Sequence, residues 1–264
     1  MIIVVANTTN ESGKTTVALN VAVEAAGAGH NVMVVDTDRN GALLSALANR
    51  EEGAPINAVQ YVEVRILRQQ MALARFRYDD VIIDACAGNS ELQQTALLLA
   101  DLVLIPFQDI GELDAMSALL AEVETRRGMP TQALAFQWMS HPREYGVARK
   151  PLDGIDFLAG SVNHHQAFSK ALSNGYGILE VSYLDPKAAI EFRLLAHEIT
   201  ERVLSATPPA RRLPKTYSEI KLMGTQVVIR VPFSYARITK LEAWAQARNI
   251  NRVSALWFLV DNLE

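Results

Sequence analysis

In residues 1–205 the apolar positions fall into short runs, and longer segments of helical composition separate these runs. Runs rich in β-branched residues predict buried strands at 2–6, 32–36, 80–84, 102–106 and 133–138. Helices are predicted between them, for example at 15–28 and 114–127. Strands that alternate with helices in this way predict an α/β fold, with a mostly parallel sheet and helices on both faces.

The pattern changes after residue 205, which predicts a second, smaller domain. A long helix at 186–205 closes the first domain. The three prolines in 208–214 make 206–224 a linker candidate. Residues 226–231 then alternate polar and apolar as a strand does, and two helical segments follow at 233–248 and 252–263. The predicted division is a domain at 1–205, a linker at 206–224 and a module at 225–264.

The composition is that of an ordinary globular protein. Hydrophobic residues make up 50% of the chain and charged residues 20%, which excludes wholesale disorder. Cys86 is the only cysteine, so no internal disulfide can form, as suits a reducing compartment. The chain opens without signal-peptide features, and its most apolar run, 96–107, is shorter than the roughly 20 residues of a membrane span. We expect a soluble, cytoplasmic protein that does not contact a membrane.

The net charge of −4 hides an asymmetry between the two ends of the chain. The residues after Pro208 include nine Lys or Arg and four Asp or Glu. This tail therefore carries about +5, and the rest of the chain about −9. A basic module on an acidic body is typical of proteins that bind nucleic acid. A solvated basic surface would explain the same charge equally well.

A phosphate-binding motif follows the first predicted strand. Gly13, Lys14 and Thr15 stand at the predicted helix start after a short loop, which is the P-loop arrangement. The helix start favours anions, Lys14 supplies a cation for the β- and γ-phosphates, and the Thr15 hydroxyl can ligate Mg²⁺. The alternative is an ordinary helix N-terminus without a ligand. The predicted nucleotide-binding residues are Asn10, Glu11, Ser12, Gly13, Lys14, Thr15 and Thr16.

Two acidic residues at the ends of predicted strands support this site. Asp36 ends the strand at 32–36, and Asp84 ends the strand at 80–84. Because ligands gather at the carboxyl ends of parallel strands, both carboxylates are expected beside the phosphate loop, where they would hold Mg²⁺ together with Thr15. Taken alone, each aspartate is explained equally well as a cap at a strand end. We expect ATP and Mg²⁺ as cofactors, with Lys14 and Asp36 as the catalytic residues.

Over about 1–205 the order and spacing of these motifs resemble the ParA/MinD family of deviant P-loop ATPases. Residues 9–16 match the family's phosphate loop, residues 36–38 its Asp-x-Asp motif, and residues 81–84 its Walker B strand. Residues 89–92 are similar to ParA-like proteins that serve conjugative DNA transfer. The resemblance implies a P-loop fold, dimerisation favoured by ATP, and slow hydrolysis that a partner protein stimulates.

The loop departs from the family pattern at three positions. The signature lysine of the family is Thr9 here, and the two glycines that follow it are Asn10 and Glu11. In the family this lysine reaches the partner's phosphates across the dimer, so its loss implies a weak ATPase at most. Glu11 adds negative charge near the phosphates and resists backbone conformations that glycine adopts easily. Either nucleotide binding is weakened or the loop has a different shape.

Residues 225–264 resemble the ribbon-helix-helix DNA-binding family, with a strand that ends at Pro232, a helix, a short turn and a second helix. So short a module cannot bury a sufficient core alone and needs a partner. In the family two chains pair their strands, and the ribbon enters the major groove. A small dimerisation tail with a basic face is the alternative. The DNA-binding candidates that the resemblance implies are Gln226, Val228, Arg230, Asn251 and Arg252.

The sequence thus predicts a ParA-like ATP-binding protein that forms a homodimer and binds DNA. It would act in plasmid or chromosome partition or in conjugative DNA transfer, with a centromere-binding or transfer protein as partner. The first alternative is a DNA-binding repressor or adaptor with a degenerate, non-hydrolysing P-loop. The second is a metabolic P-loop ligase similar to dethiobiotin synthetase, which also lacks the signature lysine, and the basic tail argues against it.

Overall fold

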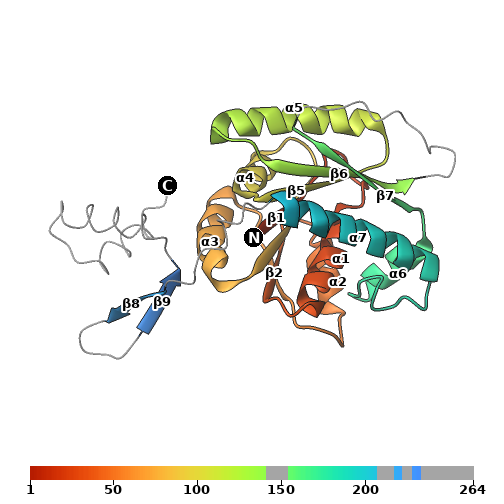
Figure 1. The fold of residues 1–264 in the computed structure, drawn as a ribbon, viewed down its shortest axis with the longest axis horizontal. Coiled ribbons are helices and arrows are strands. Elements are labelled where there is room, and N and C mark those ends of the chain that lie inside the picture. Colours follow the sequence, from red (N-terminus) through yellow and green to blue (C-terminus); the bar gives the residue numbers. More distant parts are fainter. Residues whose placement is uncertain (141–153, 207–216, 222–227, 233–264) are drawn as a thin grey trace. The chain divides into compact units, whose positions relative to one another are not determined.

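The computed structural model describes residues 1–140, 154–206, 217–221 and 228–232. The chain divides into two compact units, Met1–Leu204 and Ser205–Glu264. The first, unit 1, contains a seven-stranded sheet in which every strand pair is parallel, with helices on both faces (Figure 1). This confirms the α/β fold predicted from the sequence.

The strands lie in the order β3-β2-β4-β1-β5-β6-β7 across the sheet. Their bounds are β1 (Ile2–Val5), β2 (Val32–Asp36), β3 (Asn57–Gln60), β4 (Asp80–Asp84), β5 (Leu102–Phe107), β6 (Gln132–Ser140) and β7 (Asp156–Asn163). The helices of unit 1 are α1 (Lys14–Gly27), α2 (Ala42–Ala48), α3 (Val64–Arg77), α4 (Glu91–Leu99), α5 (Ile110–Arg127), α6 (Gln166–Ser173) and α7 (Pro186–Ala206).

Helices cover both faces of the sheet, and each face has its own apolar layer. Helices α1, α2, α6 and α7 pack on one face, where they meet Ile3 and Val5 of β1. Helices α3, α4 and α5 pack on the other face, where they meet Ile2 and Val4. Because successive strand residues point to opposite faces, a central strand between two helix layers must be apolar throughout. This explains the unbroken apolar runs of β1, β2, β4 and β5.

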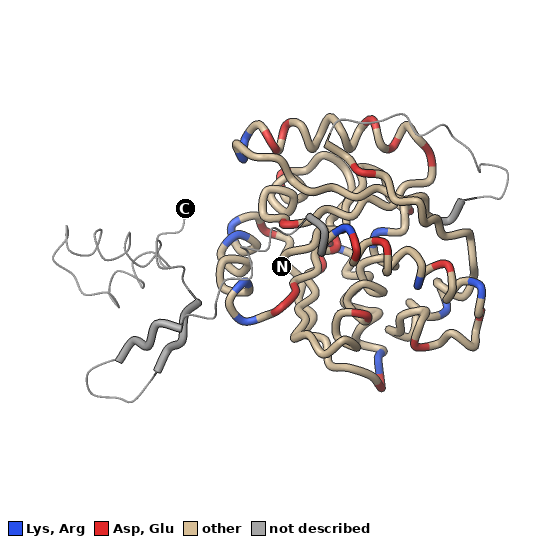
Figure 2. The backbone as a smooth tube through the Cα atoms, in the orientation of Figure 1, with Lys and Arg blue, Asp and Glu red and all other residues tan. Residues whose placement is uncertain are grey.

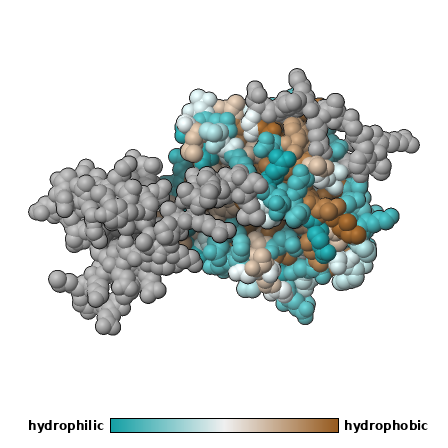
Figure 3. All heavy atoms as spheres, in the orientation of Figure 1, coloured by the Kyte–Doolittle hydropathy of each residue, from teal (hydrophilic) through white to brown (hydrophobic). Residues whose placement is uncertain are grey.

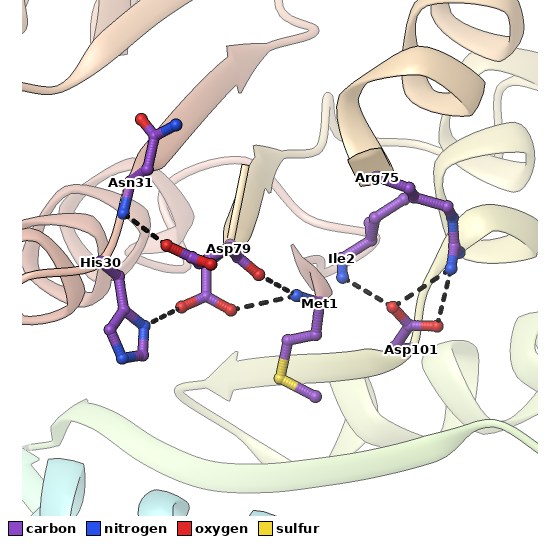
Figure 4. A network of polar contacts seen from close by, with 8 residues as sticks. Met1, Ile2, His30, Asn31, Arg75, Asp79 and Asp101 are labelled. Carbon is purple, nitrogen blue, oxygen red and sulfur yellow. Dashed lines mark hydrogen bonds and ion pairs between the residues drawn. The ribbon is translucent and has the colours of Figure 1, made fainter. Parts of the chain in front are cut away.

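The amino ends of the strands are tied together by polar contacts at the edge of the sheet opposite to the phosphate loop (Figure 4). Asp80, at the start of β4, accepts a hydrogen bond from the Met1 amino group at 3.1 Å. Asp101, just before β5, accepts one from the Ile2 N–H at 2.7 Å and forms an ion pair with Arg75 at 3.2 Å. These contacts join β1, β4, β5 and α3 at one end.

Two helices of unit 1 have distinctive surfaces: α3 is basic, and α7 exposes apolar side chains. Helix α3 carries four arginines and no acidic residue, and these stand out as blue in Figure 2. On α7, Ile190 is 58% exposed and Leu194, one turn later, is 62% exposed. Figure 3 shows brown, apolar atoms in the region of α7. Among the described residues, no helix is both long and apolar enough to cross a membrane.

Unit 2 contains an antiparallel pair of strands, β8 (Tyr217–Lys221) and β9 (Val228–Pro232). Strand β9 overlaps the strand predicted at 226–231 and ends at Pro232. Strand β8 lies inside the range predicted as a linker, so β9 has a pairing partner from its own chain. Two of the DNA-binding candidates, Val228 and Arg230, are on β9. The helices predicted at 233–248 and 252–263 lie outside the described residues, as do the other candidates, Gln226, Asn251 and Arg252.

Candidate functional site

The candidate site lies at the carboxyl ends of β1, β4 and β2, which are neighbours in the sheet. The phosphate loop, defined here as residues 9–16, runs from the segment after β1 into the first turn of α1. It opens onto a cavity of about 250 Å³. The residues that line the cavity include Asn10, Glu11, Gly13, Lys14, Thr15, Thr16, Asp38 and Asp84. All of the predicted loop residues except the buried Ser12 therefore face one space.

The start of α1 is built to receive an anion. Gly13 is the N-cap residue, with φ of 88°, a left-handed conformation that glycine adopts without strain. No side chain caps the helix, so the N–H groups of its first turn have no side-chain acceptor. These groups and the helix dipole favour a phosphate at this position.

Lys14 lies folded against the loop and is 8% exposed. Its Nζ donates to the Thr9 carbonyl oxygen and, at 3.2 Å, to Ser12 Oγ. Burial lowers the pKa of Lys14, while the negative charges of Asp84 and Glu112 oppose this shift. A buried cation held by neutral oxygen atoms still has charge to offer a phosphate.

Asp84 and Thr15 form the part of the site that suits Mg²⁺. The Thr15 hydroxyl donates to Asp84 Oδ2 at 2.7 Å, and Asp84 Oδ1 is buried with no hydrogen-bond partner among the described residues. Burial raises the pKa of Asp84 to about 7, although the hydrogen bond from Thr15 and the charge of Lys14 oppose it. An orphaned carboxylate oxygen beside a hydroxyl fits the oxygen ligands that Mg²⁺ prefers.

The two acidic residues of the Asp-Thr-Asp motif have different positions. Asp36 is 1% exposed, and both of its carboxylate oxygens accept backbone hydrogen bonds, from Asp38 at 2.9 Å, Leu43 at 3.0 Å and Leu44 at 3.2 Å. Burial raises the pKa of Asp36, and these hydrogen bonds oppose it. Asp38 is half-buried and lines the cavity. The structure thus places Asp36 behind the site and Asp38 in it.

The phosphate loop is also held from β5 and α5. Asn7 Nδ2 donates to the Pro106 carbonyl oxygen and to Glu112 Oε2, both at 2.8 Å, and Asn7 Oδ1 accepts from the Thr9 N–H at 3.1 Å. Gln108 Nε2 donates to the Glu11 carbonyl oxygen at 2.9 Å. Glu11 has φ of 59°, and it is the only non-glycine residue with positive φ in the described chain. The loop keeps the left-handed turn at a position where the family has glycine.

Asp38, Gln108 and Glu112 contribute to the site and lie beyond the predicted set. Asp38 follows the strand that Asp36 ends, and its place in the Asp-x-Asp motif was a usable signal. Gln108 follows β5, so the rule that ligands gather at carboxyl ends of strands also indicates it. Glu112 contacts Asn7 across 105 positions of the sequence, and no local pattern marks such a contact.

Comparison with known proteins identifies a matching domain family. The family model described as the CobQ/CobB/MinD/ParA nucleotide binding domain matches residues 3–225. No curated protein sequence matches the chain.

Three solved structures illustrate the shared fold. The septum site-determining protein MinD of Pyrococcus horikoshii, complexed with Mg-ADP, is 18% identical over 79% of this chain and 99% of its own, with a TM-score of 0.60. A Cyanothece McdA variant in complex with ATP is 14% identical over 75% and 96%, with a TM-score of 0.60. A Borrelia burgdorferi protein that is assigned to plasmid partition by name, bound to AMPPNP, is 12% identical over 76% and 98%, with a TM-score of 0.59. At these identities the likeness concerns the fold.

Proposed function

We propose, from the premise that the chain belongs to the CobQ/CobB/MinD/ParA family of nucleotide-binding domains, that it is a ParA-like protein that binds ATP, dimerises and binds DNA. Its role would be plasmid or chromosome partition or conjugative DNA transfer. The observation that carries the proposal is the meeting of Lys14, Thr15 and Asp84 in one cavity at the start of α1.

Each residue of the cavity has a chemical task in this proposal. The N–H groups of the first turn of α1 bind phosphate oxygens, and Lys14 neutralises part of their charge. Thr15 and Asp84 would hold Mg²⁺, which supplies positive charge to the β- and γ-phosphates when bound. Asp38 faces the same space and joins Lys14 and Asp36 as a candidate for hydrolysis, although the engaged oxygens of Asp36 support a structural role for it.

The names of similar proteins support the nucleotide and the process. The MinD protein of P. horikoshii was solved with Mg-ADP, and the McdA variant with ATP. The Borrelia protein carries the name of a plasmid partition protein and was solved with AMPPNP. We extend to this chain the use of ATP and Mg²⁺ and a part in moving or transferring DNA.

The DNA-binding part of the proposal rests on unit 2. The residues after Pro208 carry a net charge of about +5, which suits a polyanion. Arg230 on β9 is the proposed base-reading residue, since an arginine can bind guanine with two hydrogen bonds. Because both units belong to one chain, dimerisation of one unit raises the effective concentration of the other unit near its own copy. Dimerisation of either unit would therefore favour dimerisation of the other.

The test is nucleotide and DNA binding by the full chain. We expect calorimetry to show ATP binding that requires Mg²⁺ and that Lys14→Ala abolishes. We expect DNA binding that ATP strengthens and that Arg230→Ala weakens. Wild-type protein that binds no nucleotide would overturn the nucleotide half of the proposal, and full DNA binding by Arg230→Ala would overturn the role of that residue.

A second function is favoured by the phosphate loop itself. Thr9 replaces the lysine that acts across the dimer in the family, and the acidic residue Glu11 lines the cavity. These features suit a DNA-binding repressor or adaptor whose P-loop no longer hydrolyses ATP. Turnover separates the two functions, because DNA binding without any Mg²⁺-dependent ATP hydrolysis, even with a stimulating partner, supports the adaptor.

A further inference from the structure

A tryptophan from a distant strand lies directly against the phosphate loop. Trp138 is near the end of β6 and is completely buried in the apolar layer that also contains α1. A Cβ atom placed on Gly13 would lie 2.1 Å from both Cδ1 and Nε1 of the Trp138 ring. Real atoms do not approach so closely, so the indole fills the space that any other side chain at residue 13 would need.

Residue 13 must therefore be glycine for two independent reasons. Its φ of 88° already disfavours a side chain, and the ring of Trp138 removes the room for one. The indole therefore supports the one residue whose left-handed turn leads into the start of α1. A shift of that turn would move the N–H groups that we propose bind phosphate.

The polar atom of the ring is unusual as well. Trp138 Nε1 is buried and has no hydrogen-bond partner among the described residues. A buried donor without an acceptor is unfavourable, and buried indole N–H groups usually have a partner. Nε1 is one of the two Trp138 ring atoms nearest to Gly13, so a change in the conformation of the phosphate loop would alter the environment of the indole.

On its other side, Trp138 is held by aromatic rings of the helix layer. Its ring centroid lies 4.9 Å from that of Phe168 on α6, and Phe168 lies 6.4 Å from Phe192 on α7. Rings packed in a dense core have little freedom to move. The support of the loop thus reaches back to α6 and α7.

We propose that Trp138 is a positioning residue for the phosphate loop: its indole ring holds Gly13 in place, and the surroundings of the ring change when nucleotide binds. This inference rests on the proposed nucleotide binding. Tryptophan emission is the direct test. The chain has three tryptophans, so W244F/W257F leaves Trp138 as the only one. We expect its emission to change during titration with ATP and Mg²⁺, with the Kd that calorimetry gives. Unchanged emission at saturation would overturn the proposal, and this measurement needs no substitution at residue 138.

A matched pair of variants tests the support itself. Leu134 is four residues earlier on β6 and equally buried in the same apolar layer, whereas the three atoms nearest to the Gly13 position all belong to Trp138. Both Trp138→Phe and Leu134→Ala are expected to lower Tm. Only Trp138→Phe is expected to weaken ATP binding, by about tenfold, because loosening a binding constellation lowers affinity. Equal effects of the two variants on Kd would overturn the proposal.

Hydrogen exchange separates failure of this inference from failure of the proposed function. If wild-type protein binds no ATP, the proposed function is wrong, and amide exchange without nucleotide then decides the role of Trp138. We expect residues 9–16 to exchange faster in Trp138→Phe than in Leu134→Ala. Equal exchange in the two variants would show that Trp138 does not support the loop.

Discussion

The Thr15 hydroxyl and Asp84 Oδ2 are 2.7 Å apart, so the first turn of α1 is bonded directly to the carboxyl end of β4. One hydrogen bond therefore joins the helix start that we propose binds phosphate to the carboxylate that we propose holds Mg²⁺. This contact also makes the site sensitive to pH, because the Thr15 hydroxyl lies beside a carboxylate when Asp84 is ionised and beside a neutral carboxylic acid when Asp84 is protonated.

The affinity for Mg²⁺ and nucleotide should rise with pH. The pKa of Asp84 is raised to about 7 by burial, and Mg²⁺ binds the carboxylate rather than the carboxylic acid. We expect about tenfold tighter binding of AMPPNP with Mg²⁺ at pH 8 than at pH 6, measured by calorimetry. Asp84→Asn shows how much of this slope comes from the nucleotide phosphates. An equal slope in that variant would remove Asp84 from the explanation.

Replacing Glu11 with glycine should stabilise the protein and tighten nucleotide binding. Glu11 has φ of 59°, and a left-handed conformation at a non-glycine residue is unfavourable. We expect Glu11→Gly to raise the free energy of unfolding, measured by urea denaturation, by up to about 1 kcal/mol. This figure is the relief of backbone strain minus the larger conformational entropy that glycine loses on folding. Glu11→Gln is the control, because it removes the charge and keeps the strain. If Gln stabilises as much as Gly, backbone strain is not the cause.

Asp36 and Asp38 should behave differently on conversion to asparagine. Asp36 accepts three backbone hydrogen bonds through both oxygens, and an amide can accept through only one. We expect Asp36→Asn to lower the free energy of unfolding by about 1–3 kcal/mol. Asp38→Asn should leave it nearly unchanged and alter nucleotide turnover or binding instead. A stable Asp36→Asn protein that has lost turnover would restore the catalytic role predicted for Asp36.

The start of α7 should be sensitive to acid. A hydrogen bond from the Ala188 N–H, with others from His165 and Lys187, lowers the pKa of Asp185. Burial opposes a similar shift at Glu191, but hydrogen bonds from Asn163 and His165 leave its pKa below the ordinary 4.5. A carboxyl with a depressed folded-state pKa stabilises the fold above its unfolded pKa.

This stabilisation is lost as the pH falls below 4.5 and through the lower folded-state value. We expect the Tm of the wild type to fall more steeply below that pH than the Tm of Glu191→Gln, which cannot titrate at this position. Thermal melts followed by circular dichroism at a series of pH values measure the two slopes. Parallel slopes would mean that Glu191 contributes nothing to acid sensitivity.

The sequence predicted the centre of the sheet better than its edges. Strands β1, β2, β4 and β5 are buried on both faces, so their residues form apolar runs that local pattern reveals. Strands β3 and β7 are at the two edges of the sheet and have half-exposed patterns, and no strand was predicted at either. Edge strands lack the constraint that makes central strands easy to recognise.

The same distinction applies to the candidate site. Gly13, Lys14 and Thr15 were found because they are adjacent in the chain, and Asp84 because it ends an apolar strand. Trp138 was missed because its contact with Gly13 exists only in the folded protein. It read as one more apolar residue of a predicted strand, and a single sequence carries no sign of what lies beside such a residue.

The polar contacts of Asp80 and Asp101 fasten the sheet at the edge away from the phosphate loop (Figure 4). These contacts and the two apolar layers hold the sheet through groups other than residues 9–11. We therefore expect substitutions at residues 9–11 to alter the nucleotide site while the seven-stranded sheet still forms.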